Sequence, residues 1–156
     1  MLMTTTRKIL GFFLLALLAM SLTACSSKEA ATADAFQKKL ESLGYEVVDI
    51  TAQYAQFEHI QKALGLEKGG VHIEFFKINS KDAATAMFNG NSERVKKFKS
   101  SGAVESSVSV SNYQTYSLTT DETYYTVSRI DDTLIYAYSS KEKKDVLQDI
   151  LSGLDY

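Results

Sequence analysis

The sequence predicts an α+β domain over residues 34–156: an antiparallel-rich sheet with helices packed on one face, ending in a four-strand meander followed by a helix. Two observations carry this prediction. Apolar residues recur at helical spacing in several stretches before residue 100, and from Ala103 the spacing switches to two over four consecutive segments. Runs of strands beside helices indicate the α+β class. The 156 residues, 45% of them hydrophobic and 23% charged, suffice for one globular domain.

Residues 1–24 have the pattern of a targeting segment. Arg7 and Lys8 form a positive flank, and Ile9 to Met20 form a nearly unbroken apolar run, shorter than the roughly 20 residues that span a bilayer. Mostly small residues follow up to Ala24, as a signal cleavage site requires. The alternatives are a short membrane anchor and a core helix. The run is too short for the first, and its N-terminal position argues against the second.

The segment ends in Leu22-Thr23-Ala24-Cys25, which contains the only cysteine of the chain. This box resembles the lipobox of bacterial lipoproteins: an aliphatic residue, two small residues and a cysteine. The resemblance implies signal cleavage between Ala24 and Cys25, a diacylglyceryl group on the Cys25 thiol, and a lipidated N-terminus and tether over residues 25–33. At least two acyl chains on one residue give stable anchoring, which a single chain does not. A single cysteine also excludes an internal disulfide and a thiolate-cluster metal site.

The first part of the domain is expected to alternate helices and strands. A helix begins near Thr32, carries an apolar stripe at i, i+4 and i+7, and ends at Gly44. A short strand over Tyr45–Ile50 follows. A second, weaker helix is expected from Tyr54 to Leu64, where apolar residues again approximate a helical period.

The middle of the domain is expected to hold a buried strand and a long helix. Lys68-Gly69-Gly70 is predicted to form a flexible loop, and Val71–Ile78, apolar on both faces, a central strand. Asn79 is expected to cap a helix that extends to Lys99. Asn89-Gly90 is its weak point, where the helix either continues, kinks or restarts.

The four C-terminal strands are joined by short turns that set their pairing. Asp131-Asp132 predicts a two-residue turn that pairs Ile130 with Thr133. The strands are expected from Ala103 to Val110 and over Gln114–Leu118, Thr123–Ile130 and Thr133–Ser139.

The other two turns decide which side chains share a face. A four-residue turn, Thr119–Glu122, pairs Leu118 with Thr123, and a three-residue turn, Ser111–Tyr113, turns two valines of the first strand toward the core. The predicted buried face consists of Val108, Val110, Tyr116, Leu118, Tyr125, Val127, Leu134, Tyr136 and Tyr138.

The opposite face is mostly small and hydroxylated and is expected to face solvent. Its candidate interaction residues are Thr115, Ser117, Tyr124, Thr126 and Ser128. Such a surface either is simply solvated or hydrogen-bonds a peptide, a glycan or a partner domain. A final helix, capped by Ser139 or Ser140 and ended by Gly153, closes the domain.

Few residues have a spacing that points to chemistry. His72 and Glu74 would share a strand face, but no third metal ligand has a recognisable spacing. No serine stands in a Gly-x-Ser-x-Gly elbow, and the acidic pairs lie at predicted turns. No catalytic residue, metal or cofactor is therefore expected. The basic helix end, Arg94 to Lys99, either is solvated or touches anionic lipid headgroups.

The expected function is that of a non-catalytic interaction or structural module on the outer side of a bacterial membrane. Its expected partners are the membrane, through lipidated Cys25, and an envelope protein or glycan. The net charge of −2 argues against nucleic acid. The alternatives are a small solute- or glycan-binding accessory lipoprotein and an envelope hydrolase.

Gly44–Thr51 and Ile130–Ala137 give the domain a general resemblance to small lipoproteins of unassigned function in Gram-positive bacteria. A Gram-negative origin stays open. There, Ser26 after the cysteine would imply the outer membrane. Neither resemblance implies a molecular activity.

Overall fold

The computed structural model describes residues 27–156, so the lipobox, with Ala24 and Cys25, lies outside the described residues. Within the described part, no helix combines the length and apolar composition that a membrane crossing needs. The helices are α2 (Ala33–Ser42), α3 (Lys81–Lys96) and α4 (Lys144–Ser152), with short 3₁₀ turns η2 (Thr51–Tyr54) and η3 (Lys141–Lys143). The strands are β1 (Val48–Asp49), β2 (Ile60–Lys68), β3 (Val71–Ile78), β4 (Val104–Val110), β5 (Tyr113–Thr119), β6 (Thr123–Ile130) and β7 (Thr133–Ser140).

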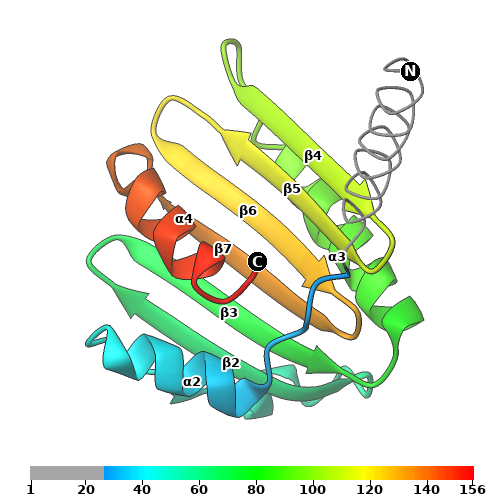
Figure 1. Cartoon of the computed structure of the whole chain (residues 1–156). Coiled ribbons are helices and arrows are strands. Elements are labelled where there is room, and N and C mark those ends of the chain that lie inside the picture. The colour runs from blue at the N-terminus through cyan, green and yellow to red at the C-terminus, as the bar shows by residue number, and fades with distance from the viewer. Residues whose placement is uncertain (1–26) are drawn as a thin grey trace, which may run out of the picture.

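The strands form one seven-stranded sheet in the order β1-β2-β3-β7-β6-β5-β4, with antiparallel pairing throughout (Figure 1). The predicted mixed α+β class and antiparallel sheet are therefore confirmed. After β3 the chain crosses the sheet through α3 to the far edge, and β4 to β7 then return strand by strand until β7 pairs with β3. The apolar pattern on both sides of β3 agrees with this central position.

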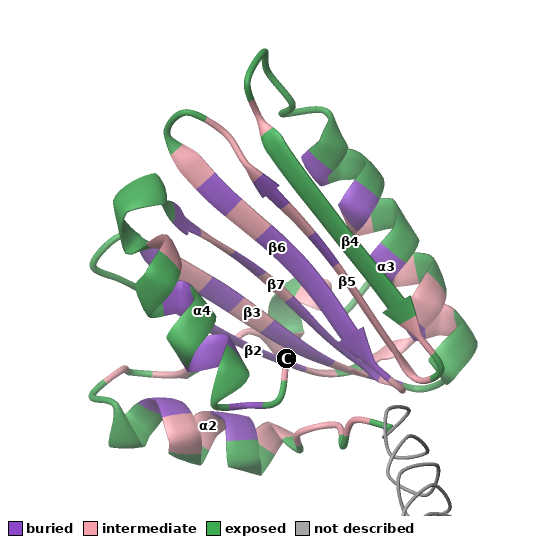
Figure 2. Ribbon diagram, turned by 45° about the horizontal axis from the view of Figure 1, so that its top comes forward, coloured by how far each residue is buried: buried purple, intermediate pink, exposed green. Residues whose placement is uncertain are grey.

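The helices cover both faces of the sheet, and the prediction that they pack on one face is wrong. On one side, here the α3 face, α3 packs over β5, β6 and β7. On the other, the α2–α4 face, α2 and α4 pack over β2, β3 and β7 (Figures 1 and 2). The physical reason is that α4 carries its own apolar stripe, which must be buried, and α3 already occupies the first face.

Helix α2 forms as its sequence predicts. The Thr32 hydroxyl accepts a hydrogen bond from the Ala35 N–H (3.1 Å), which caps the N-terminus. At the other end Gly44, with φ of +80°, turns the chain while Gly44 N–H and Tyr45 N–H bond the carbonyls of Glu41 and Leu40. The buried Phe36 ring stacks on Phe75 of β3, with centroids 4.9 Å apart, and so fixes α2 to the sheet.

The prediction of a second helix from Tyr54 to Leu64 is wrong. Only a 3₁₀ turn forms at Thr51–Tyr54, and strand β2 begins at Ile60. Gly69 and Gly70, predicted to be a flexible loop, form the tight turn between β2 and β3, both with positive φ (62° and 78°). A two-residue turn of this kind holds two strands in register, so the segment before it must be extended.

Helix α3 is continuous through Gly90, so the sequence's weak point does not break it. Its cap is Ser80, whose hydroxyl accepts from the Ala83 N–H (3.2 Å), and not the predicted Asn79. Helix α4 ends at Gly153 as predicted, but η3 precedes it and neither predicted serine caps it.

The meander follows the predicted registers in part. Ile130 pairs with Thr133 across the Asp131-Asp132 turn, which confirms that hairpin. Leu118 pairs with Tyr125 and not with Thr123. This shift of two residues leaves every side chain on its predicted face, because side chains alternate with period two.

The β4–β5 hairpin differs by one residue. Its turn has two residues, since Val110 pairs with Tyr113, and the predicted three-residue turn is wrong. Val104 and Val108 therefore lie on the α2–α4 face, beyond the reach of α4, and are 67% and 43% exposed (Figure 2). On the α3 face β4 instead presents Glu105, which accepts hydrogen bonds from Tyr116 and Lys99. These two bonds account for the register that places the valines outside the core.

Candidate functional site

The five residues expected to form an interaction face share the α2–α4 face, but they do not form an open surface. Three of them, Tyr124, Thr126 and Ser128, are buried, and Thr115 and Ser117 are half-buried. The Tyr124 ring belongs to the core formed with α4. The Thr115 hydroxyl lies 2.9 Å from that of Ser128 and is thereby satisfied within the protein. The expected exposure of this face is therefore wrong.

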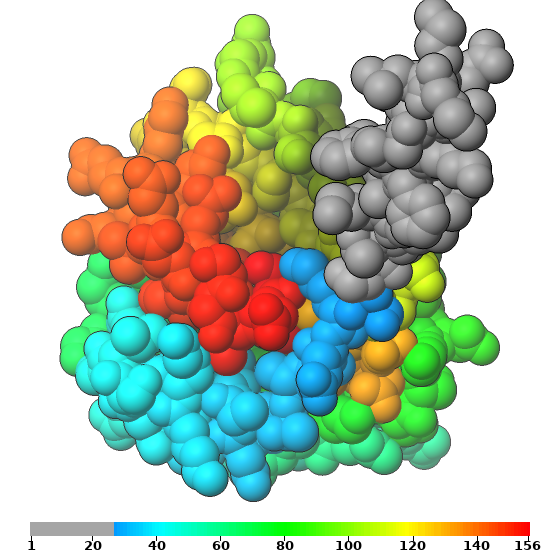
Figure 3. All heavy atoms as spheres, in the orientation of Figure 1, coloured from blue at the N-terminus to red at the C-terminus, as the bar shows by residue number. Residues whose placement is uncertain are grey.

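The segment expected to be a free tether contacts the domain from Lys28 onward. The Lys28 N–H donates to Asn112 Oδ1 (3.1 Å), and Asn112 Nδ2 donates to the Lys28 carbonyl (2.6 Å). The Lys28 ammonium also donates to the Asp155 carbonyl (2.8 Å). Figure 3 shows residues 27–32 lying against the C-terminal residues on the α2–α4 side. The chain is thus fixed to the sheet three residues after Cys25.

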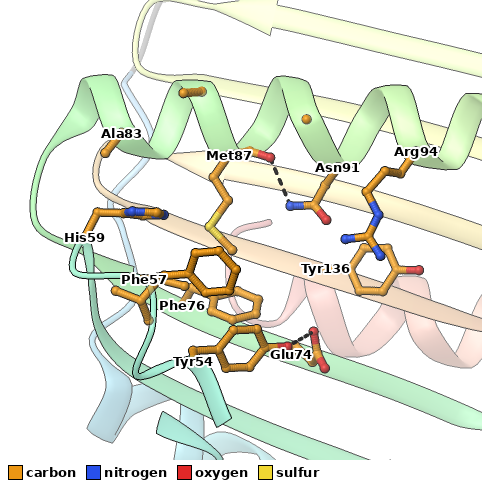
Figure 4. Close-up of a pocket in the computed structure, with 13 residues that line it drawn as sticks. Tyr54, Phe57, His59, Glu74, Phe76, Ala83, Met87, Asn91, Arg94 and Tyr136 are labelled. Atoms are coloured by element: carbon orange, nitrogen blue, oxygen red, sulfur yellow. Dashed lines mark hydrogen bonds between the residues drawn. The ribbon is translucent and has the colours of Figure 1, made fainter. Parts of the chain in front are cut away.

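A cavity of about 650 Å³ opens on the α3 face, between α3 and the segment that contains η2 (Figure 4). Its floor comes from β3 and β7 and its two walls from α3 and from the η2–β2 segment. It is lined by Tyr54, Phe57, His59, Ile60, Glu74, Phe76, Ala83, Ala86, Met87, Gly90, Asn91, Arg94 and Tyr136.

Small residues on α3 leave this space open. Ala83, Ala86 and Gly90 recur at three- and four-residue spacing and so line one side of the helix facing the cavity. A Cβ atom placed on Gly90 meets no atom within 4 Å. The opposite wall is aromatic: the rings of Tyr54 and Phe76 meet edge to face with centroids 5.0 Å apart. Phe57 continues this wall and stays 43% exposed. The cavity is therefore an apolar cleft with aromatic rings along one side.

One end of the cavity is polar. The Tyr54 hydroxyl donates to Glu74 Oε2 (3.1 Å), and His72 Nε2 lies 3.3 Å from Glu74 Oε1 on the other side of the carboxylate. Burial and the Glu74 charge raise the pKa of Tyr54 to about 12. Burial also raises the pKa of Tyr136. Both hydroxyls therefore keep their protons at physiological pH and can donate a hydrogen bond.

His72 contacts the Glu74 carboxylate and helps to hold its position. Its ring stacks on Tyr138 with centroids 4.5 Å apart, and the hydrogen bond to Glu74 raises its pKa. Its Nδ1 atom is buried without a hydrogen-bond partner among the described residues. The two residues share a strand face, as their spacing predicts. Within residues 27–156 no group of three His, Cys, Asp or Glu side chains is placed to hold a metal ion.

Arg94 supplies the second charge of the cavity. It lies in the last turn of α3, and its side chain extends toward Tyr136 (Figure 4). Two of its basic neighbours are paired: Lys96 with Glu93 and Lys99 with Glu105, each at 2.6 Å. Over residues 27–156, the Arg94 guanidinium forms no ion pair or side-chain hydrogen bond.

The sequence patterns do not predict this cavity. Tyr54, Phe57 and Ile60 fall within a predicted helix that does not form, so their position opposite α3 is not expected from the sequence. The available signal was the set of small residues on α3, because a helix face of alanine and glycine leaves space against a flat sheet.

Comparison of the chain with models of known protein families, with curated proteins and with solved structures returned no match in any of the three.

Proposed function

We propose that this chain is a lipid-anchored, extracytoplasmic protein whose domain binds a small, largely apolar ligand in the α3 cavity. The observation that carries the proposal is the cavity itself. Its volume of about 650 Å³ lies within the range of about 300–1,000 Å³ typical of ligand sites. Its apolar walls with a few polar groups at one end have the composition of such sites.

An open cleft of this size needs an explanation, because its apolar walls are left in contact with water. Phe57 and Met87 both line it, and Phe57 keeps 43% of its surface exposed to water. A ligand with an apolar body would remove that surface from water, at about 25 cal/mol per Å². Its polar group would lie at the Glu74 end. These contacts amount to binding and require no covalent step.

The membrane anchor in this proposal is the lipid on Cys25 that the lipobox implies. Lys28, which already contacts Asn112 and Asp155, lies three positions after Cys25. At about 3.3–3.6 Å per residue the extended connection spans only about 10 Å. We therefore expect the end of the sheet that carries Asn112 to lie at the bilayer surface.

Binding can be tested through a single side chain. The chain has four methionines, Met1, Met3, Met20 and Met87, so cleavage at Cys25 would leave Met87 alone, in the cavity wall. The full chain is labelled at its methionine methyl groups with carbon-13 and placed in lipid nanodiscs. 4-Phenylbutanol, a neutral probe with an aromatic body, is then titrated. We expect a saturable shift of the Met87 methyl signal, which Met87→Leu assigns.

Two variants of one helix make this test specific. Gly90→Leu fills the cavity and should abolish the shift. Asn89→Leu places the same side chain one residue earlier, outside the cavity lining, and should leave binding intact. No saturable shift in the wild type, or equal binding by Gly90→Leu, would refute the proposed site.

The anchor has a separate test. A labelled fatty acid should be incorporated into the wild type and not into Cys25→Ala. Label in both proteins, or in neither, would contradict lipidation of Cys25.

A further inference from the structure

We infer that the ligand of the α3 cavity is an apolar carboxylate, with its anionic head paired to Arg94 and its body against the aromatic wall. The inference rests on the proposed function, because it names the class of ligand that the same cavity takes. It follows from the way the two charged residues of the cavity are used.

The negative charge of the cavity is already satisfied. Glu74 accepts from the Tyr54 hydroxyl at one oxygen (3.1 Å) and lies against His72 Nε2 at the other (3.3 Å). A cationic ligand would meet a carboxylate whose two oxygens each already have a partner, and so would gain less from it than from a free one. The geometry therefore disfavours an amine as the polar head.

The positive charge has no protein partner among residues 27–156, and exposed Arg94 is left to water. Glu93 on the same helix and Glu105 on β4 pair with other cations, Lys96 and Lys99. The guanidinium of Arg94 is left, within the described residues, without a carboxylate. Its planar fork of N–H groups matches a carboxylate in a two-bond arrangement.

A second donor lies beside it. The Tyr136 hydroxyl, whose pKa is raised by burial, stays protonated and forms no hydrogen bond within residues 27–156. Arg94 and Tyr136 both line the cavity, and Figure 4 shows the Arg94 side chain extending toward Tyr136, so a carboxylate bound there would have both donors available. The apolar body would then run along the cavity toward Phe76, Phe57 and Met87. The arrangement separates a charged end from an apolar end, as an amphipathic anion does.

Three probes with one aromatic body and different heads test the inference: 4-phenylbutyrate, 4-phenylbutanol and 4-phenylbutylamine. Each is titrated into the methionine-labelled chain in nanodiscs, and the dissociation constant is read from the Met87 methyl shift. We expect the carboxylate to bind about five- to tenfold more tightly than the alcohol, as a charge-assisted pair at an open cavity allows. The amine should bind no better than the alcohol.

Arg94→Gln identifies the residue responsible. It should weaken the carboxylate about five- to tenfold and leave the alcohol unchanged. Lys97→Gln, which removes one exposed positive charge from the same helix end, is the matched control and should change neither. Equal losses in the two variants would reduce the effect to general electrostatics and overturn the inference.

Failure of the inference is distinguishable from failure of the site. Binding of the alcohol that Gly90→Leu blocks, with no preference for the carboxylate, would leave the cavity as a ligand site and refute the role of Arg94. No binding of any of the three probes would refute the site itself.

Discussion

Replacing Gly90 by alanine should stabilise the protein, although the residue lies in the wall of the proposed site. Gly90 is the tenth of the sixteen residues of α3 and has no positive φ. The added Cβ atom would meet nothing within 4 Å, so no packing cost opposes the change. In a helix interior alanine is favoured over glycine by about 0.8–1.0 kcal/mol, chiefly because glycine loses more backbone entropy on folding.

The expected gain in the free energy of unfolding is therefore about 1 kcal/mol, which corresponds to a rise in Tm of about 4 °C for a domain of this size. Urea unfolding followed by far-ultraviolet circular dichroism measures it, with an unchanged dependence on urea concentration. One methyl group removes little of the 650 Å³, so 4-phenylbutanol should still bind.

Gly44→Ala is the matched control. Gly44 ends α2 with φ of +80°, a conformation that costs an L-residue about 1–2 kcal/mol, so this change should destabilise the protein. If Gly90→Ala instead lowered the stability, or altered the urea dependence, α3 would be interrupted at Asn89-Gly90. The continuous wall of the cavity would then be refuted.

Two further predictions concern the strands. The Glu74 hydrogen bond raises the pKa of His72, so the folded state binds more protons and the free energy of unfolding falls as pH rises through and beyond 6.5. Urea unfolding from about pH 6 to about pH 9 should show the advantage of the wild type over His72→Gln shrinking with pH, and a constant difference would contradict the linkage. Val108→Ala should cost less than about 0.5 kcal/mol because the side chain is 43% exposed. Buried Val127→Ala should cost about 2 kcal/mol, and equal costs would refute the two-residue β4–β5 turn.

The parts of the fold that could be predicted are those where local signals agree. Helix α2 has an apolar stripe, a capping threonine and a terminal glycine, and it forms within two residues of its predicted bounds. The β6–β7 pairing follows from the Asp131-Asp132 turn between two alternating segments. In each case the sequence specifies the backbone without help from distant residues.

The errors arise where distant contacts decide. In Tyr54–Leu64 an approximate helical period competed with the Gly69-Gly70 turn, and the turn prevailed because β2 gains a full ladder with β3. The predicted β4–β5 register assumes that Val108 is buried. This assumption fails because β4 is an edge strand, whose contact with the α3 face is made by Glu105. The burial of Tyr124 depends on α4, which begins only at Lys144, after the next strand.

The site could not be predicted because it combines small side chains on α3 with aromatic rings from a different part of the sequence. Taken alone, Ala83, Ala86 and Gly90 indicate only that one side of α3 carries little side-chain volume. What makes this a cavity is the presence of Tyr54 and Phe57 across from it, and their position depends on β2 being a strand.

The unequal covering of the two faces explains why a cavity forms on this side. Seven strands about 4.8 Å apart span about 29 Å, whereas a helix with its side chains is about 10–12 Å wide. The α2–α4 face has two helices and residues 27–32, but on the α3 face a single helix lies over β5, β6 and β7. The strip left open between α3 and η2 must then be lined by residues that tolerate both water and apolar neighbours. Tyrosine meets that requirement, and Tyr54 of η2 and Tyr136 and Tyr138 of β7 lie half-buried along it. The open space beside α3 is therefore a consequence of the topology, and in our proposal the Arg94 guanidinium, unpaired within residues 27–156, makes that space selective for an anion.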